Sequence, residues 1–221
     1  MKKLLLIFCL SILTTIGYSQ LYKTVKVDTL ISVSLPAVYA KKDTASQLTL
    51  SAKASYGFIV VTRIPNGASN APLKKEKDLN QVFKNYVRDV QQVGNGTILN
   101  ERDTLMGTVK GHLFTLKTQD DNGDVQFRQF LFIYSRDASY TFQYFYSEGQ
   151  SELIGADTKP FYSSIKLQPD LQRNDQYLVP SKPGMSGGVK MILYGGSGLI
   201  VILIMISLLI RRKKKRSAIQ E

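Results

Sequence analysis

The sequence predicts an α+β domain, an antiparallel β-sheet of about six to seven strands with two helices packed mainly on one face, plus one C-terminal transmembrane helix. Three observations predict this arrangement. Short runs of alternating apolar and polar residues fill most of residues 21–147, as is typical of half-buried strands. Residues 78–93 instead repeat apolar residues at helical spacing. Residues 191–210 contain no charge, and a helix of this length spans a bilayer core.

The first strands are short. Alternating runs within residues 25–35 stop at Pro36, and residues 47–53 alternate again. Residues 57–64 are richer in Val and Ile, which favours a more deeply buried strand. Residues 65–77 carry Pro, Gly, Ser and Lys and are expected to form a polar loop.

A helix is expected over residues 78–93. Asp78 is the predicted N-cap. The apolar stripe comprises Leu79, Val82, Phe83, Tyr86, Val87 and Val90. The Gly-Asn-Gly sequence at residues 94–96 tolerates left-handed backbone and therefore ends the helix.

The next part of the chain predicts a meander of antiparallel strands. Its strands are expected at residues 97–105, 108–117, 125–136 and 139–147. Asn122 and Gly123 lie between two alternating runs and indicate a hairpin turn. A last helical segment is expected over residues 150–165, with Asp157 as an N-cap and Pro160 in the following first turn.

The N-terminal residues 1–19 have the pattern of a signal peptide. Lys2 and Lys3 precede an apolar run over residues 4–13, and small residues follow. Cleavage is expected after Ser19. An uncleaved N-terminal anchor is the alternative, although the apolar run is short for a membrane span.

The C-terminal part predicts a membrane anchor. Residues 168–188 are expected to form a stalk, residues 189–210 a transmembrane helix, and residues 211–221 a basic tail. Basic clusters that flank a span stay in the cytoplasm. Residues 20–167 would therefore form a periplasmic domain of a single-pass protein of the bacterial inner membrane. The lipid bilayer is thus the first predicted partner.

The charge and the cysteine content argue against a nucleic-acid-binding protein, a disulfide-bonded domain and a thiolate metal site. The net charge is +12, but eight of the 29 basic residues lie at the two ends, which leaves 21 against 16 acidic residues between Gln20 and Ile210. The high net charge therefore indicates membrane topology rather than a nucleic-acid-binding surface, and no nucleic-acid partner is predicted. The single cysteine, Cys9, leaves with the signal peptide, so the mature domain has neither disulfides nor thiolate metal sites.

The sequence offers no catalytic machinery. His112 is the only histidine and lies in the middle of a predicted strand, so a structural role is favoured. Residues 120–124 resemble a calcium loop, but the glycine is one position early and Leu131 stands where the bidentate glutamate belongs. No serine lies in a nucleophile-elbow pattern. No catalytic, cofactor-binding or metal-ligating residue is predicted, and no cofactor is expected.

Aromatic density is the feature with the most functional interest. Tyr140, Phe142, Tyr144 and Tyr146 share one face of a predicted strand. Two interpretations remain open. These side chains form core beneath a helix, with cross-strand aromatic pairs stabilising the sheet, or they form an exposed platform that binds a peptide, a glycan or a lipid.

The order of motifs resembles a known family. The segments ISVSLPAVY, GFIVVTRI, DLNQVFKNYVRDVQQV and FYSSIKL follow one another within about residues 22–167. This order is similar to that of PsbP-like and DcrB-like α/β sandwich domains. The resemblance implies an antiparallel sheet with helices on one face and a non-catalytic accessory or binding role. It transfers no functional residue, and the predicted membrane anchor departs from the soluble or lipid-linked forms common in that family.

The function expected first is therefore a non-enzymatic extracytoplasmic binding or accessory module, with an envelope protein or a glycan as its partner. A second hypothesis is a substrate of a C-terminal sorting enzyme, because Ser186, Gly187 and Gly188 precede the apolar run and the basic cluster. Cleavage would then occur near Gly188. A hydrolase with an unrecognised site is the third alternative.

Overall fold

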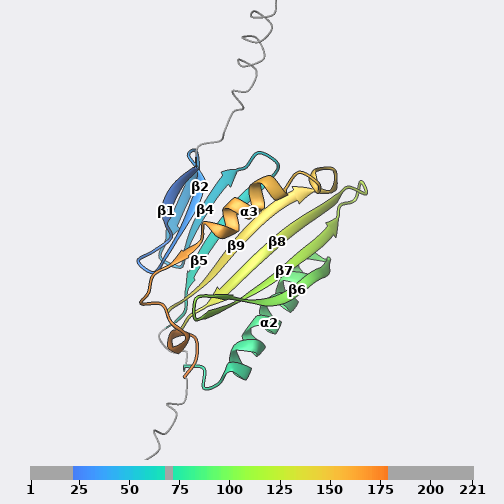
Figure 1. The fold of residues 1–221 in the computed structure, drawn as a ribbon. Helices are drawn as coiled ribbons and strands as arrows, with labels where there is room; N and C mark the ends of the chain where they lie inside the picture. The colour runs from blue at the N-terminus through green and yellow to red at the C-terminus, as the bar shows by residue number, and fades with distance from the viewer. Residues whose placement is uncertain (1–21, 68–71, 179–221) are drawn as a thin grey trace, which may run out of the picture. The chain divides into compact units, whose positions relative to one another are not determined.

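The structure of the chain is a computed structural model that describes residues 22–67 and 72–178 (Figure 1). Within these residues, ten strands form two antiparallel sheets, which confirms the α+β class. The smaller sheet has the order β1 (Tyr22–Lys26), β2 (Ile31–Pro36) and β10 (Lys166–Leu167). The larger sheet has the order β3 (Ala40–Thr44), β4 (Gln47–Lys53), β5 (Phe58–Pro65), β9 (Ala138–Ser147), β8 (Val125–Tyr134), β7 (Val109–Gln119) and β6 (Thr97–Met106).

The larger sheet confirms the meander from β6 to β9, but the described residues form ten strands in two sheets, where one sheet of about six to seven strands was predicted. Its interior strand β8 is apolar on both sides. Leu131 and Ile133 point to one face, and Phe130 and Phe132 point to the other; all four are buried. Because side chains alternate along a strand, both faces of this part of the sheet must be covered.

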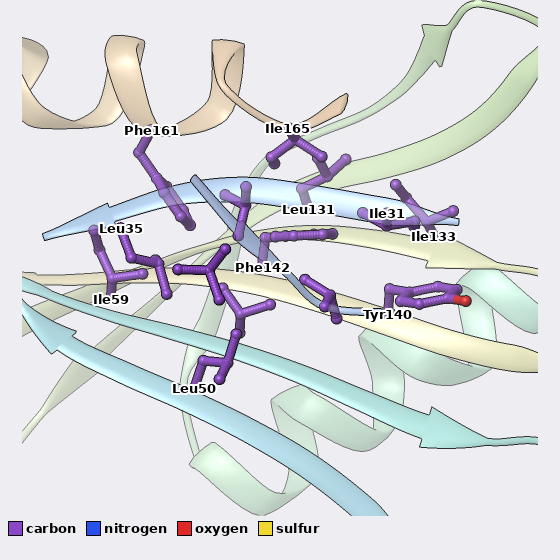
Figure 2. Close-up of a cluster of buried hydrophobic side chains, with 14 of the residues drawn as sticks. Ile31, Leu35, Leu50, Ile59, Leu131, Ile133, Tyr140, Phe142, Phe161 and Ile165 are labelled. Carbon is purple, nitrogen blue, oxygen red and sulfur yellow. The ribbon is translucent and has the colours of Figure 1, made fainter. Parts of the chain in front are cut away.

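The smaller sheet and helix α3 (Gly155–Ser163) cover the first face. Figure 2 shows Ile31 and Leu35 of β2, together with Phe161 of α3, above Phe142 and its neighbours on the larger sheet. Each of these apolar side chains is at most 1% exposed. This interface is the main hydrophobic core.

Helix α2 (Glu76–Gly94) covers the opposite face along β6, β7 and β8. It buries Leu79, Phe83 and Val87 against the sheet. The two helices therefore lie on opposite faces (Figure 1), and the prediction that both pack mainly on one face was wrong. The reason is the two-sided apolar character of β8, which requires an additional layer on each side.

The limits of the helices differ slightly from the predicted ones. Helix α2 begins two residues before Asp78, whose carboxylate accepts the N–H of Lys75 at 3.0 Å from inside the first turn. Its predicted end is confirmed, because Asn95 has a left-handed φ of 46°. Helix α3 begins at Gly155, so Asp157 is not its N-cap.

The domain extends to Leu178, which shortens the predicted stalk of residues 168–188. Leu171 is buried and Gln176 is 1% exposed. The side chain of Gln176 accepts the N–H of Lys110 at 2.7 Å and donates to the carbonyls of Lys110 and Tyr134 at 2.7 and 2.9 Å. Residues 168–178 are therefore part of the domain.

Several predictions fall outside the described residues. These are the signal peptide of residues 1–19, the rest of the stalk, the transmembrane helix of residues 189–210 and the tail of residues 211–221. In the part of the chain that the structure describes, no helix is long and apolar enough to cross a membrane. The anchor and the location of the domain therefore stay predictions.

The contacts of Gln176 give a prediction for stability. Gln176→Ala removes three hydrogen bonds at a buried site and leaves their backbone partners unpaired, so it should lower the free energy of unfolding by about 2–3 kcal/mol. Urea denaturation followed by circular dichroism measures the change. The exposed Gln172→Ala is the control and should change stability by less than about 0.5 kcal/mol. Equal effects of the two variants would contradict the docking of this segment.

Candidate functional site

The aromatic face predicted from the sequence lies in the core. Tyr140, Phe142 and Tyr144 are each 0% exposed beneath the smaller sheet and α3 (Figure 2). Tyr146 is partly buried and its ring stacks on that of Phe127, with centroids 5.2 Å apart. Tyr140, Phe142 and Tyr144 therefore form core and present no open surface to a partner, which corrects the platform interpretation for these three side chains.

The two fully buried tyrosines use their hydroxyls to join layers. The Tyr140 hydroxyl donates to Oδ2 of Asp28 at 2.6 Å, and Nε of Arg63 reaches the same oxygen at 2.8 Å. The Tyr144 hydroxyl donates to Oδ2 of Asp157 in α3 at 2.8 Å. Burial, reinforced by these carboxylates, raises the pKa of both tyrosines. Their protonated hydroxyls therefore serve as fixed donors.

His112 lies in a polar cluster beneath α2. Its Nδ1 is 2.7 Å from Oδ1 of Asp103, and its Nε2 is 3.0 Å from Oε1 of Glu101. The ring also stacks on Phe83 of α2, with centroids 5.1 Å apart. A β-bulge in β6, where Asn100 has a φ of 53°, brings Glu101 toward the histidine.

Lys110 extends this cluster to the start of α2. Its ammonium group contacts Asp103 at 2.7 Å, Asn80 at 2.9 Å and Glu76 at 3.0 Å. Burial raises the pKa of Asp103, but hydrogen bonds with Lys110 and His112 outweigh it and bring the pKa below its ordinary value. Each group is matched by an opposite charge or a hydrogen bond, so the cluster fastens α2 to β6 and β7.

The remaining candidates from the sequence are structural. Oδ1 of Asp120 accepts the N–H of Asn122 at 3.0 Å and the N–H of Asp124 at 2.9 Å, which is turn geometry. Gly123 has a φ of 89°, a conformation that glycine favours. Among the described residues, no group of three or more histidine, cysteine or acidic side chains is placed to hold a metal ion.

Within residues 22–67 and 72–178, no helix and no second sheet covers the half of the larger sheet beside α2. We call it the open face: the α2 side of β3, β4, β5 and β9, with Arg128 of β8 at its border. Helix α2 contacts β6, β7 and β8. Partly exposed Thr49, Val60 and Gln143 represent its mixed polar and apolar character.

A groove of about 480 Å³ runs where the open face meets α2. Val90 and Val93 of α2 line one wall, and Phe130 and Gln143 line the sheet side. Val93 is 90% exposed, which is unusual for a large apolar side chain.

A contact between Tyr86 and Thr141 sets the distance between α2 and the open face. The Tyr86 hydroxyl shares a hydrogen bond of 3.1 Å with Oγ1 of Thr141. Burial raises the pKa of Tyr86 to about 12, although this hydrogen bond lowers it. The neutral Tyr86 hydroxyl therefore holds α2, which forms one wall of the groove, at a fixed distance from β9.

The sequence contains a pattern of alternating polar residues that indicates the open face, although the aromatic residues at the intervening positions are more prominent. The alternation of Gln47, Thr49, Ser51 and Lys53 placed a polar side on β4, and Thr141 and Gln143 likewise alternate with the tyrosines of β9. The sequence did not show that these polar sides lie on the same surface of the sheet. Strands β4 and β9 are far apart in the sequence, but in the folded sheet only β5 lies between them.

Comparisons with known proteins found similar solved structures only at low sequence identity. No family model and no curated protein matches the chain. The solution structure of PsbP (CyanoP) from Synechocystis sp. PCC 6803 is similar, with a TM-score of 0.46 and 14% identity over 70% of this chain and 96% of that protein. A crystal structure from Bacteroides thetaiotaomicron matches with a TM-score of 0.40 and 11% identity over 63% of this chain. The match spans 45% of that second protein.

These similarities carry no argument about function at such scores. Membership of the PsbP-like family stays a prediction.

The polar cluster gives a prediction for pH dependence. The folded-state pKa of Asp103 lies below 3.8, its ordinary value, so its contribution to stability is present above that value and is lost as the pH falls through the folded pKa. Asp103→Asn should therefore lower the melting temperature at pH 7, by the equivalent of less than about 1 kcal/mol because the side chain is half exposed.

The difference between the variant and the original chain should shrink when melting is followed at pH 3. The exposed Asp170→Asn serves as the control and should change the melting temperature little at either pH. A difference in melting temperature between Asp103→Asn and the original chain that stayed constant from pH 7 to pH 3 would show that the charge of Asp103 does not stabilise the fold.

Proposed function

We propose that this chain is a non-enzymatic binding or accessory module that acts outside the cytoplasm and is held in the bacterial inner membrane by one C-terminal helix. The open face is the observation that carries the binding role. It combines partly exposed apolar and polar side chains in one area beside a groove, as interaction surfaces of soluble domains do.

The arrangement of titratable groups supports a role without catalysis. His112 lies between two carboxylates and beneath Phe83, where a substrate has no access to its ring nitrogens. The buried carboxylate of Asp157 accepts hydrogen bonds from Tyr144 and from the N–H of Tyr56 at 2.8 Å each. These groups are occupied in holding the fold together.

The membrane location rests on two independent sequence signals. An N-terminal export signal places the domain outside, and a basic cluster after residues 191–210 keeps the C-terminus inside. The described chain ends at Leu178, so about ten residues connect the domain to the predicted span. Ten extended residues reach at most about 35 Å, which would keep the domain close to the membrane surface.

Photo-crosslinking tests the binding role. A benzophenone amino acid placed at Phe58, which lies on the open face and is 42% exposed, should form a defined adduct with another envelope component in living cells. The same group at Val38, which is 88% exposed in the loop before β3, is the matched control and should form none. Without an adduct specific to Phe58, the open face is not a binding surface.

Protease treatment tests the location separately. In intact spheroplasts, protease added outside should degrade residues 20–178, while a tag fused after Glu221 remains protected. Immunoblots against the domain and the tag measure both outcomes. A domain that survives until the membrane is lysed would rule out the extracytoplasmic location.

A further inference from the structure

A second groove lies away from the open face, between the β6–β7 hairpin and the segment that follows α3. Met106 and Thr108 line the side of the hairpin, and Ile165, Leu167 and Leu171 line the other side. Figure 1 shows the green hairpin near the orange segment after α3. We call this site the hairpin groove. Its volume of about 610 Å³ lies in the range of sites that hold small molecules.

The floor of the hairpin groove continues the main hydrophobic core. Ile165 is 6% exposed and Leu171 is 4% exposed, and both belong to that core. Met106, Tyr162 and Leu167 are partly buried and pack against it. An apolar group placed in the groove would therefore extend the core and lose its contact with water, which favours binding.

The lining of the hairpin groove is uncharged. None of the described residues that line it is acidic or basic, and Lys166, Asp170 and Arg173, which neighbour them in the sequence, do not line it. The groove beside α2 differs, since Asp89 and Arg128 both line it. A charged group that entered the hairpin groove would lose water and gain no opposite charge. The site therefore favours an uncharged ligand.

The polar side chains of the lining favour an apolar ligand over a glycan, because several of their donors are already used. Three hydroxyl or amide groups donate to backbone carbonyls of the domain: Tyr162 to Gln129 at 3.0 Å, Ser163 to Pro160 at 3.2 Å and Gln172 to Pro169 at 3.3 Å. A glycan has many hydroxyl groups, and these would lose hydrogen bonds to water without gaining these three donors.

The position of the hairpin groove indicates where such a ligand comes from. One wall includes Gln172, and the chain from there to Leu178 spans at most about 22 Å even when extended. About ten further residues, which reach at most about 35 Å, connect Leu178 to the predicted span of residues 189–210. A tether of this length gives the groove a high effective concentration of membrane lipid. Lipid hydrocarbon chains are apolar and uncharged, as the lining requires.

We propose that the hairpin groove binds the acyl chain of a lipid drawn from the bilayer that holds the predicted anchor. This inference rests on the membrane location in the proposed function and adds a second site to the open face. The acyl chain lies against Ile165 and Leu171 in place of water. The headgroup stays outside the groove in solvent, because the lining offers no charge to bind it.

The test uses the full-length chain in liposomes of phosphatidylcholine and phosphatidylglycerol. A trace of phosphatidylcholine carries a diazirine at the end of one acyl chain, and light attaches it to the residues it touches. Mass spectrometry should locate adducts at Ile165 or Leu171, and also in residues 189–210, which contact lipid in any case if they span the bilayer. Val38, which is 88% exposed beyond the far end of β2, should carry no adduct.

A charge placed in the groove makes the test specific. Thr108 is exposed and lines the groove, so Thr108→Glu should lower labelling of Ile165 and Leu171 by about tenfold. Labelling of residues 189–210 should not change. Thr97→Glu makes the same substitution at an exposed site at the start of β6 and should leave both signals unchanged. Circular dichroism confirms that each variant is folded.

The two labelled regions separate this inference from the proposed function. Adducts in residues 189–210 without adducts in the groove would overturn the inference and leave the proposed function intact. Undiminished groove labelling in Thr108→Glu would overturn it as well. A chain without adducts in either region would lack the membrane anchor, which would remove both proposals.

Other occupants of the hairpin groove give different results. Displacement of the groove label by added oleate, at a concentration far below that of the bilayer lipid, would identify a free fatty acid and overturn the bilayer as the source. Chemical crosslinking of two chains that Thr108→Glu abolishes, together with an unlabelled groove, would identify a second copy as the occupant and also overturn the proposal.

Discussion

The structure depends on the two apolar sides of strand β8. Phe130 and Phe132 require cover on the side opposite to Leu131 and Ile133, so the sheet must lie between two other layers. The cover on the second side is one helix of 19 residues, α2. A helix is about 10 Å wide and strands are about 4.8 Å apart. One helix therefore shields only two or three of the seven strands, and an uncovered half of the sheet follows from this geometry.

The layers are joined by polar contacts as well as by apolar packing. No cysteine occurs among the described residues, so no disulfide joins their layers. Instead, the Tyr140 hydroxyl donates a hydrogen bond to Asp28 in the loop between β1 and β2, and the Tyr144 hydroxyl donates one to Asp157 in α3. A directional hydrogen bond between layers determines their relative position more precisely than apolar contact does, because burial alone tolerates sliding.

The sequence predicted local structure well and long-range arrangement less well. Helix α2 and the strands from β6 to β9 are visible as periodic patterns, because their faces differ in polarity over many residues. The edge strand β3 was missed, since all of Ala40–Thr44 is exposed and shows no alternation. The short strand β10 was missed for a different reason: two residues at Lys166–Leu167 contain no period, and only pairing with β2 defines the strand.

The candidate site shows the same limit. The pattern placed Tyr140 and its neighbours on one face but did not show which face of the sheet the second layer would cover. The register that brings Lys53, Phe58, Phe145 and Arg128 into one row joins four separate strands. No local pattern in the sequence contains that information, because each strand contributes one residue.

The margins of the larger sheet have a consequence for how the protein meets other molecules. One outermost strand, β3, carries Lys41, Lys42 and Asp43, and the other, β6, is interrupted at its bulge. Charges and bulges at sheet edges discourage the addition of a foreign strand. Main-chain pairing of the β-augmentation kind, which is indifferent to most side chains, is thereby disfavoured. Under the proposed binding role, recognition at this sheet would rest on side chains.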